Sequence, residues 1–318
     1  MTTGPIDGMA GPDARDGRTY VPSEQLRLAV KVALATGRPL LLRGEPGTGK
    51  SSFASYAAYR RNWRYYEHVV TSRTEARDLL WTFDLVRRLA DAQAHRLAED
   101  DRAYVEPGVL WWALAPRSAM LRGHARNLVE RVAHDPRMPT GHRRPPGQGA
   151  VVLIDEIDKA DPDVPNGLLS PLGCRSFVVS ETGDAIHVER GHAATRPSGS
   201  PLIVVTTNEE RELPTAFLRR CLTVTLPAPD APQLVDIARR HLKVSAGEVS
   251  ADALELADEL ARTVLVLRAE AHAAGVRAPS TAEYLDALHA CLRLRITPRS
   301  KEWTWLKEMA LIKDPGMD

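Results

Sequence analysis

The chain has 318 residues, of which 43% are hydrophobic and 26% charged, which is ordinary for a globular protein of one large or two modest domains. A formal net charge of +1 excludes a general electrostatic attraction to nucleic acid or to anionic membranes. No apolar run reaches the roughly 18 residues that a membrane helix needs, and the first residues lack the apolar core of a secretory signal. The three cysteines are widely spaced and favour a reducing compartment over a disulfide framework or a zinc site. We therefore predict a soluble, cytoplasmic protein.

The first predicted elements are a tail, a helix and a strand. Residues 1–19 contain Gly, Pro and Asp without an apolar stretch, and are predicted to form a loose, disordered tail. Ser23 is expected to cap a helix that ends near Gly37, because the apolar residues between them recur at helical spacing. The apolar run Leu40–Leu42 is typical of a strand that is buried on both faces of a parallel sheet.

A glycine-rich loop directly follows this strand and precedes a helical segment that starts at Ser52. Its eight residues are Gly44, Glu45, Pro46, Gly47, Thr48, Gly49, Lys50 and Ser51. The glycines allow successive backbone N–H groups to point at phosphate oxygens, and the helix N-terminus adds partial positive charge. Lys50 is expected to reach the β- and γ-phosphates, Ser51 to bind Mg²⁺, and Ser52 to complete the loop. The sequence therefore predicts a site for a nucleoside triphosphate and Mg²⁺.

Further apolar runs alternate with helical stretches. They are His68–Thr71, Val151–Ile154, Leu202–Val205 and Leu222–Leu226. Alternation of strands and helices predicts an α/β fold, with a parallel five-stranded sheet covered by helices on both faces.

The segment from Arg122 to Arg144 is irregular and basic. It contains six arginines against Glu130 and Asp135, hence a charge of +4 with histidines neutral. Such a segment is either a solvated loop or helical insertion, or a contact surface for an acidic partner or nucleic acid. Because no aromatic residues are interleaved with the arginines, we do not favour nucleic acid.

Two acids end the strand that begins at Val151. Asp155 and Glu156 place charge at the carboxyl edge of the sheet, where ligands of open α/β sheets bind. Asp155 is expected to hold Mg²⁺ through water, and Glu156 to orient and deprotonate an attacking water. The alternative is that the acids simply favour a helix N-terminus, which is the role we expect for Asp158.

Two later elements extend the predicted site. Asn208 follows the strand Leu202–Val205 and is expected to hold the attacking water near the γ-phosphate, although a strand-end Asn is often only a turn residue. Arg219 and Arg220 end a short helix that Pro214 begins. A cation is favourable at a helix C-terminus in any case, but these arginines are also candidates for an arginine finger that enters a neighbouring subunit's site.

The chain is predicted to become all-helical after about residue 230. Ser250 begins one amphipathic helix, and Ser280 with Glu283 forms a capping box that opens another. A last helix, within Lys301–Lys313, is expected either to dock onto this bundle or to bind a partner. The predicted domains are 1–19 as the tail, 20–229 as the nucleotide-binding domain, 230–298 as the helical lid, and 299–318 as a C-terminal helical tail.

The order of these elements resembles AAA+ ATPases, and specifically their MoxR-type branch, from Tyr20 to Leu292. The motifs that carry the resemblance are GEPGTGKS, VVLIDEIDKADPDVPNGLL, VVTTNEERELPTAFLRRC and RAPSTAEYLDAL. The resemblance implies an αβα nucleotide domain with strand order 5-1-4-3-2 and a small helical lid. It also implies rings, usually hexamers, that bind ATP between subunits and remodel or mature a partner protein, often one with a von Willebrand factor A-type domain.

The resemblance further assigns roles to residues. It implies that the loop up to Ser51 is Walker A, that Asp155 and Glu156 form Walker B, and that Asn208 is sensor 1. It favours Arg220 over Arg219 as the finger, and it implies that adenine lies against the backbone at Tyr20 and Val21.

Two positions depart from the family pattern. Ala282 stands where the sensor 2 arginine is often found, and Arg277 is the candidate to replace it. Pro171 interrupts a helix that the family keeps continuous, before a hairpin expected around Thr182–Asp184. Two alternatives to the remodelling ATPase therefore stay open: a nucleotide-dependent scaffold with weak hydrolysis, and a GTP- or ATP-driven subunit of a nucleic-acid enzyme.

Overall fold

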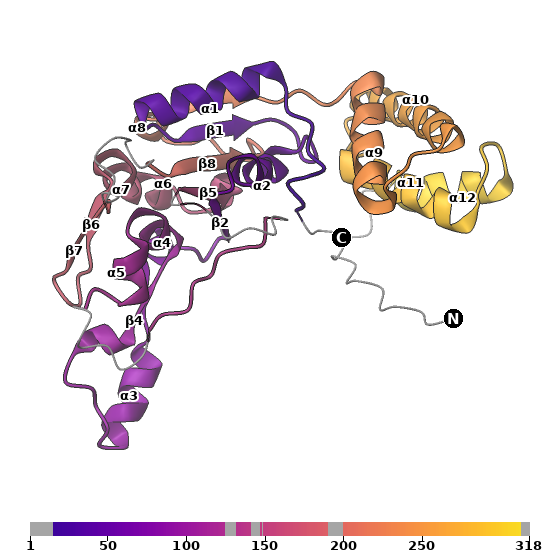
Figure 1. Ribbon diagram of the computed structural model, residues 1–318. Coiled ribbons are helices and arrows are strands. Elements are labelled where there is room, and N and C mark those ends of the chain that lie inside the picture. Colours follow the sequence, from indigo (N-terminus) through magenta and orange to yellow (C-terminus); the bar gives the residue numbers. More distant parts are fainter. Residues whose placement is uncertain (1–14, 125–131, 141–146, 148, 190–199, 313–318) are drawn as a thin grey trace.

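The computed structural model describes residues 15–124, 132–140, 147, 149–189 and 200–312. A parallel five-stranded sheet forms its centre, in the order β2-β5-β8-β1-β9 (Figure 1). The strands are β1 (Leu40–Arg43), β2 (Arg64–Val69), β5 (Ala150–Asp155), β8 (Leu202–Thr207) and β9 (Leu222–Thr225). Counted by themselves along the chain, these strands have the predicted order 5-1-4-3-2.

The central strands are apolar because both faces of the sheet are covered. Every residue of β5 and β8 is buried. One face packs against α1 (Glu24–Thr36) and α2 (Lys50–Arg61). The opposite face packs against short helices between β2 and β9. They are η1 (Ala76–Leu79), α4 (Val109–Leu114), α5 (Pro116–Met120), η3 (Ile157–Lys159), α6 (Asp163–Gly167), α7 (Leu169–Cys174) and α8 (Thr215–Leu218).

Two antiparallel hairpins extend from this second face. One pairs β3 (Trp81–Phe83) with β4 (Val105–Pro107) and carries α3 (Leu85–Gln93) and η2 (Asp101–Tyr104) between its strands, with α3 projecting away from the sheet (Figure 1). The other pairs β6 (Ser176–Val178) with β7 (Ala185–His187). Gly183 turns at this second tip with φ 73°, which confirms the hairpin predicted there.

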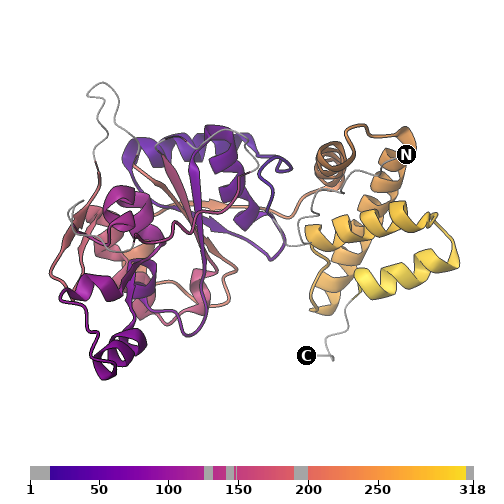
Figure 2. The same ribbon diagram turned by 60° about the horizontal axis from the view of Figure 1, so that its bottom comes forward.

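The C-terminal helices have a core of their own, separate from the two cores that flank the sheet (Figure 2). They are α9 (Ala231–Ala246), α10 (Ala251–Ala274), α11 (Thr281–Leu294) and α12 (Lys301–Ala310). Ser250 caps α10, and the predicted capping box of Ser280 with Glu283 opens α11. Trp303 and Leu306 of α12 are buried in this bundle, so the prediction that the last helix docks onto it is confirmed. The domain boundaries stay predictions.

Two predictions need correction. The second strand was expected at His68–Thr71 but runs from Arg64 to Val69, because this strand lies at the edge of the sheet and its polar residues interrupt the apolar run expected of a buried strand. A loose tail was predicted for residues 1–19, of which residues 1–14 lie outside the described ranges. Residues 15–19 are not loose, because Arg15 contacts Asp155 of β5 and Ser55 of α2. The helix that Pro171 was expected to interrupt is indeed divided into α6 and α7, but the break is at Leu168, and Pro171 lies in the first turn of α7.

The basic segment is only partly described, since residues 125–131 and 141–146 lie outside the described ranges. Its first arginine, Arg122, is buried and contacts the carboxylate of Glu106 at 2.6 Å. This arginine therefore belongs to the interior rather than to a contact surface. Among the residues that the structure describes, no helix has both the length and the apolar character needed to cross a bilayer.

Candidate functional site

The glycine-rich loop lies between β1 and α2 at the carboxyl edge of the sheet. Gly44, Gly47 and Gly49 have φ angles of 137°, 79° and 87°, a region that residues with a Cβ rarely adopt. Gly49 is the N-cap of α2 and offers no side chain to cap the helix. The first N–H groups of α2 are therefore available to an anion, as the sequence predicted.

Lys50 is folded back onto this loop. Its Nζ donates to the carbonyl oxygens of Gly44 at 2.6 Å and Glu45 at 2.8 Å. Burial lowers the pKa of Lys50, and the nearby carboxylates of Asp155, Asp158 and Glu156 oppose that shift. The loop carbonyls thus hold the ammonium group near the acids at the end of β5 and in η3.

Asp155 ends β5 with its carboxylate almost fully buried, at 3% exposure. Its Oδ1 accepts hydrogen bonds from Ser51 Oγ at 2.7 Å and Thr206 Oγ1 at 2.5 Å. Its Oδ2 accepts one from Arg15 at 2.7 Å. The structure therefore brings together Ser51 and Asp155, the two predicted Mg²⁺ residues.

This donor set fits Mg²⁺. The ion prefers oxygen ligands, and in nucleotide sites it is held by one or two protein oxygens together with phosphates and water. No group of three or more His, Cys, Asp or Glu side chains suited to a metal occurs among the described residues. One hydroxyl and one carboxylate beside the glycine-rich loop fit a metal ion that would take its other ligands from phosphates and water.

Glu156 follows Asp155 in a left-handed conformation, with φ 59° and ψ 49°. Such a conformation costs a non-glycine residue about 1 kcal/mol or more, and it is typical of residues held in place for function. The hydroxyl of Thr206 accepts a hydrogen bond from the Glu156 N–H at 2.9 Å, which holds this backbone. The carboxylate contacts Lys159 Nζ at 2.7 Å and accepts a hydrogen bond from Asn208 Nδ2 at 3.3 Å. The two residues expected to handle the attacking water are therefore in direct contact.

Asp158 has a role that the sequence did not reveal. Its side chain is 2% exposed, and its Oδ2 accepts hydrogen bonds from the backbone N–H groups of Asn208 at 3.1 Å and Glu210 at 3.0 Å. It lies within η3 and fixes the loop that carries Asn208, so it is not simply a helix-start residue. The one sequence signal for this role is that Asp158 closely follows Asp155 and Glu156, the two acids at the end of the strand.

Tyr20 lies beside the phosphate loop, whereas Val21 is 42% exposed. The Tyr20 ring packs against Phe53 and Tyr56 of α2, and it is 3.1 Å from the position that a Cβ on Gly49 would occupy. The segment predicted to contact adenine is therefore next to the start of α2.

The helical bundle touches the loop at Gly47. A Cβ on this glycine would come within 2.3 Å of the Ser280 Cβ, at the start of α11. Ala282 lies in the first turn of the same helix. Arg277, the candidate to replace the sensor 2 arginine, is paired with Glu283 at 3.0 Å and is largely exposed.

Arg268 of α10 is a lid residue that the sequence analysis missed. Its guanidinium donates to the carbonyl oxygens of Pro279 and Pro229, both at 2.9 Å. Burial lowers its pKa, and Glu45 of the phosphate loop opposes the shift. Arg268 thus fastens the turn before α11 to the segment that enters the bundle.

Arg219 and Arg220 lie at the amino ends of the parallel strands, whereas the glycine-rich loop lies at their carboxyl ends. They precede Leu222, which is paired with Leu40 at the start of β1, whereas the phosphate loop follows the end of β1. Arg220 cannot therefore reach the site of its own chain, as a finger that acts on a neighbouring subunit requires.

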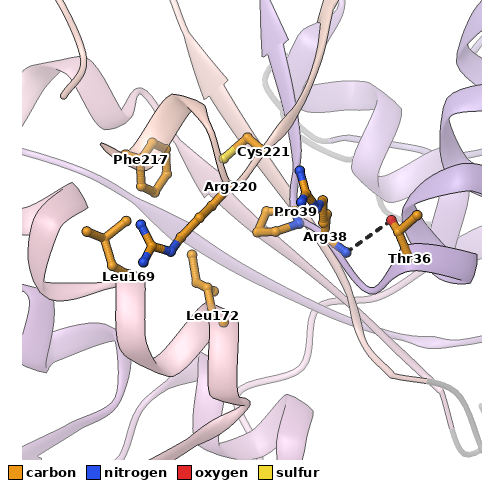
Figure 3. A pocket seen from close by; sticks show the side chains of 9 residues that line it. Thr36, Arg38, Pro39, Leu169, Leu172, Phe217, Arg220 and Cys221 are labelled. Atoms are coloured by element: carbon orange, nitrogen blue, oxygen red, sulfur yellow. Dashed lines mark hydrogen bonds between the residues drawn. The ribbon is translucent and has the colours of Figure 1, made fainter. Parts of the chain in front are cut away.

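Arg220 borders a surface cavity of about 230 Å³ (Figure 3). The other residues around it are Thr36, Arg38, Pro39, Leu169, Leu172, Gly173, Phe217 and Cys221. Arg38 Nη1 donates to the carbonyl oxygen of Arg219 at 3.2 Å, and Arg220 Nη1 donates to that of Ala216 at 3.1 Å. The side chains of Arg38 and Arg220 are both exposed. That of Arg220 is held against α8 by its bond to Ala216.

Comparison with known proteins supports the fold and the loop. A family model described as AAA domain (dynein-related subfamily) matches residues 39–221, which is more than half of the chain. No curated protein matches.

Three solved structures are similar to this chain at low identity. NtrX from Brucella abortus is 14% identical with a TM-score of 0.47, over 89% of this chain and 54% of its own. NtrX in complex with ADP is 15% identical with a TM-score of 0.47, over 92% and 55%. A candidate ATPase from Cytophaga hutchinsonii is 14% identical with a TM-score of 0.42, over 93% and 83%. The chain spans about half the length of NtrX.

Proposed function

The chain belongs to the AAA domain family, in its dynein-related subfamily, and from this membership we propose that it hydrolyses ATP with Mg²⁺ at the glycine-rich loop. The observation that carries this proposal is the contact between Glu156 and Asn208 beside the loop that holds Lys50. A nucleotide-binding site without hydrolysis would not need a carboxylate and an amide held together at that place.

Each side chain has a defined task in this proposal. The N–H groups at the start of α2 and the ammonium group of Lys50 bind the phosphates. Ser51 and Asp155 hold Mg²⁺, which would neutralise charge on the phosphate oxygens when bound. Glu156 accepts a proton from the attacking water while Asn208 orients that water. Thr206 fixes both acids, since its hydroxyl donates to Asp155 and accepts from the Glu156 backbone.

The complete site needs a second subunit. Arg220 lies at the opposite edge of the sheet from the loop of its own chain. In a ring, this edge of one subunit faces the phosphate loop of the next, and an arginine there stabilises the charge that develops on the γ-phosphate. We therefore propose a homo-oligomeric ring, a hexamer by resemblance, with ATP between subunits.

The finer assignment is to the MoxR-type branch. It rests on the resemblance of the motifs around Lys50, Asp155, Asn208 and Ser280, and on the hairpin β6–β7 before β8. On this basis the ring remodels or matures a partner protein, for which one with a von Willebrand factor A-type domain is the candidate. A cytoplasmic location stays a prediction.

The test is Glu156→Gln, which removes the proton acceptor and keeps the shape of the side chain. Binding of a fluorescent ATP analogue should stay parental, while the rate of phosphate release falls by about 10²- to 10⁴-fold. Glu210→Gln is the matched control, since it makes the same change at an exposed acid whose backbone hydrogen bond to Asp158 stays in place. Parental hydrolysis by Glu156→Gln would show that the base is assigned wrongly.

A scaffold that uses ATP only for assembly is the second candidate. It is favoured by one observation, the pairing of Arg277 with Glu283, which leaves Ala282 without a replacement arginine at this turn. A parental protein that assembles with ATP but releases no phosphate would support it. A nucleic-acid enzyme is less favoured because Arg122 of the basic segment is buried, and it would be supported by preference for GTP and stimulation by DNA.

A further inference from the structure

Arg15 joins two carboxylates behind the candidate Mg²⁺ site. Its guanidinium contacts Asp155 Oδ2 at 2.7 Å and Glu67 Oε1 at 2.5 Å. The hydroxyl of Tyr65 donates to the other oxygen of Glu67 at 2.7 Å. Burial disfavours the charge on Arg15, but Asp155 and Glu67 outweigh burial and raise its pKa. The buried carboxylate of Asp155 thus has a fixed cation on one of its oxygens.

Arg15 reaches Asp155 from the side of β2, the edge strand beyond β5. The strand order places β2, which carries Glu67, beyond β5 and away from β1 and its phosphate loop. Glu67 is paired in register with Leu153, two residues before Asp155, so it lies deeper along the sheet than the carboxylate. Ser51 approaches the opposite carboxylate oxygen, Oδ1. Arg15 therefore contacts the carboxylate oxygen of Asp155 that Ser51 and Thr206 do not contact.

Residues 15–18, which we call the strap, are fastened to both parts of the molecule. The Arg15 carbonyl oxygen accepts a hydrogen bond from Ser55 Oγ of α2 at 2.8 Å. Gly17 is pressed against α2, where an added Cβ would come within 2.6 Å of the Ser55 carbonyl oxygen. The Arg18 carbonyl oxygen accepts a hydrogen bond from Arg240 Nε of α9 at 2.8 Å. The position of Arg15 is therefore set by backbone contacts and not only by its charge.

We propose that Arg15 is a positioning residue for Asp155, which holds this carboxylate in the orientation that binds Mg²⁺. Asp155 has Ser51 and Thr206 on one oxygen and Arg15 on the other, so its rotation is blocked from both sides. Partners that orient a metal ligand in this way affect metal binding by about 10- to 100-fold. The inference rests on the proposed Mg²⁺ site.

The experiment measures binding of a fluorescent ADP analogue in EDTA and across a Mg²⁺ titration. In Arg15→Gln, the Mg²⁺ concentration that gives half of the maximal increase in analogue binding should rise by about 10- to 100-fold. The Kd of the analogue in EDTA should stay parental. Arg15→Lys should recover part of the loss, since an ammonium group keeps the charge but not the fork that bridges Glu67 and Asp155. Arg18→Ala is the matched control, because its side chain pairs with Asp16 within the strap and its carbonyl oxygen stays in place.

Gly17→Ala is a second variant that changes no charge. It displaces the strap from α2 and should raise the Mg²⁺ requirement in the same direction as Arg15→Gln. An unchanged requirement in Arg15→Gln overturns the inference, and so does a lower one, which would make Arg15 a competitor of Mg²⁺. If the parental protein itself shows no Mg²⁺ dependence, then the proposed Mg²⁺ site fails, and the inference fails with it.

Discussion

Replacing Asp158 tests whether the loop that carries Asn208 is held by a single buried carboxylate. Asp158 Oδ2 accepts backbone hydrogen bonds from Asn208 and Glu210 at 3.1 and 3.0 Å. A hydrogen bond to a charged group contributes about 1.5–3 kcal/mol, and the lower value applies because both N–H groups are only partly buried and would regain water. Asp158→Ala should therefore cost roughly 3 kcal/mol of unfolding free energy. Asp158→Asn keeps an acceptor oxygen and neutral hydrogen bonds, so it should cost about 1 kcal/mol.

The assay combines thermal unfolding with steady-state phosphate release. A loss of about 3 kcal/mol lowers the Tm by roughly 6–12 °C in a domain of 150–250 residues. Displacement of Asn208 by about 1 Å should reduce kcat by on the order of 10²-fold, since catalytic geometry tolerates little error. The reasoning is refuted if Asp158→Ala matches Asp158→Asn in both Tm and kcat.

Two further predictions concern the subunit interface and the lid. Mixing Arg220→Ala with Lys50→Ala subunits should restore phosphate release, because mixed interfaces then combine an intact loop with an intact finger; activity no greater than the sum of the separate variants would contradict this. Burial, with a smaller contribution from His289, lowers the pKa of His241 to about 4, so its unfolded form takes up a proton first as the pH falls. Stability should therefore be fully present above pH ~6.5 and decline towards pH ~4, by up to about 3 kcal/mol, and His241→Gln should flatten this decline in thermal unfolding. An equally steep decline in the variant would assign the effect to other groups.

The sequence was sufficient for the buried strands and the helix caps. The strands β1, β5 and β8 are continuous apolar runs because both faces of the sheet are covered, and that pattern depends only on local composition. Ser23, Ser250 and Ser280 cap their helices as predicted, since an N-cap is a local hydrogen bond within three residues. The glycine-rich loop was predictable because its residues are contiguous in the sequence, between a strand and a helix.

Features that depend on long-range contacts could not be predicted. The strand β2 was placed too late because its edge position permits Arg64, Glu67 and His68 among its residues. The hairpin β3–β4 was not foreseen, since its strands are three residues each and are separated by α3. The roles of Arg15 and Asp158 arise from partners that are 140 and 50 positions away in the sequence. No local pattern reports such partners.

Gly47 belongs to two surfaces at once. The sequence explains it as a glycine that lets the loop bend around phosphate, yet its other side is so close to Ser280 that a methyl group there would collide with the bundle. A Gly47→Ala change would push the loop and the start of α11 apart, because the added methyl group would collide with Ser280. The backbone at Gly47 is therefore a direct contact between the glycine-rich loop and the start of α11, so a shift of the loop at this point would press on Ser280.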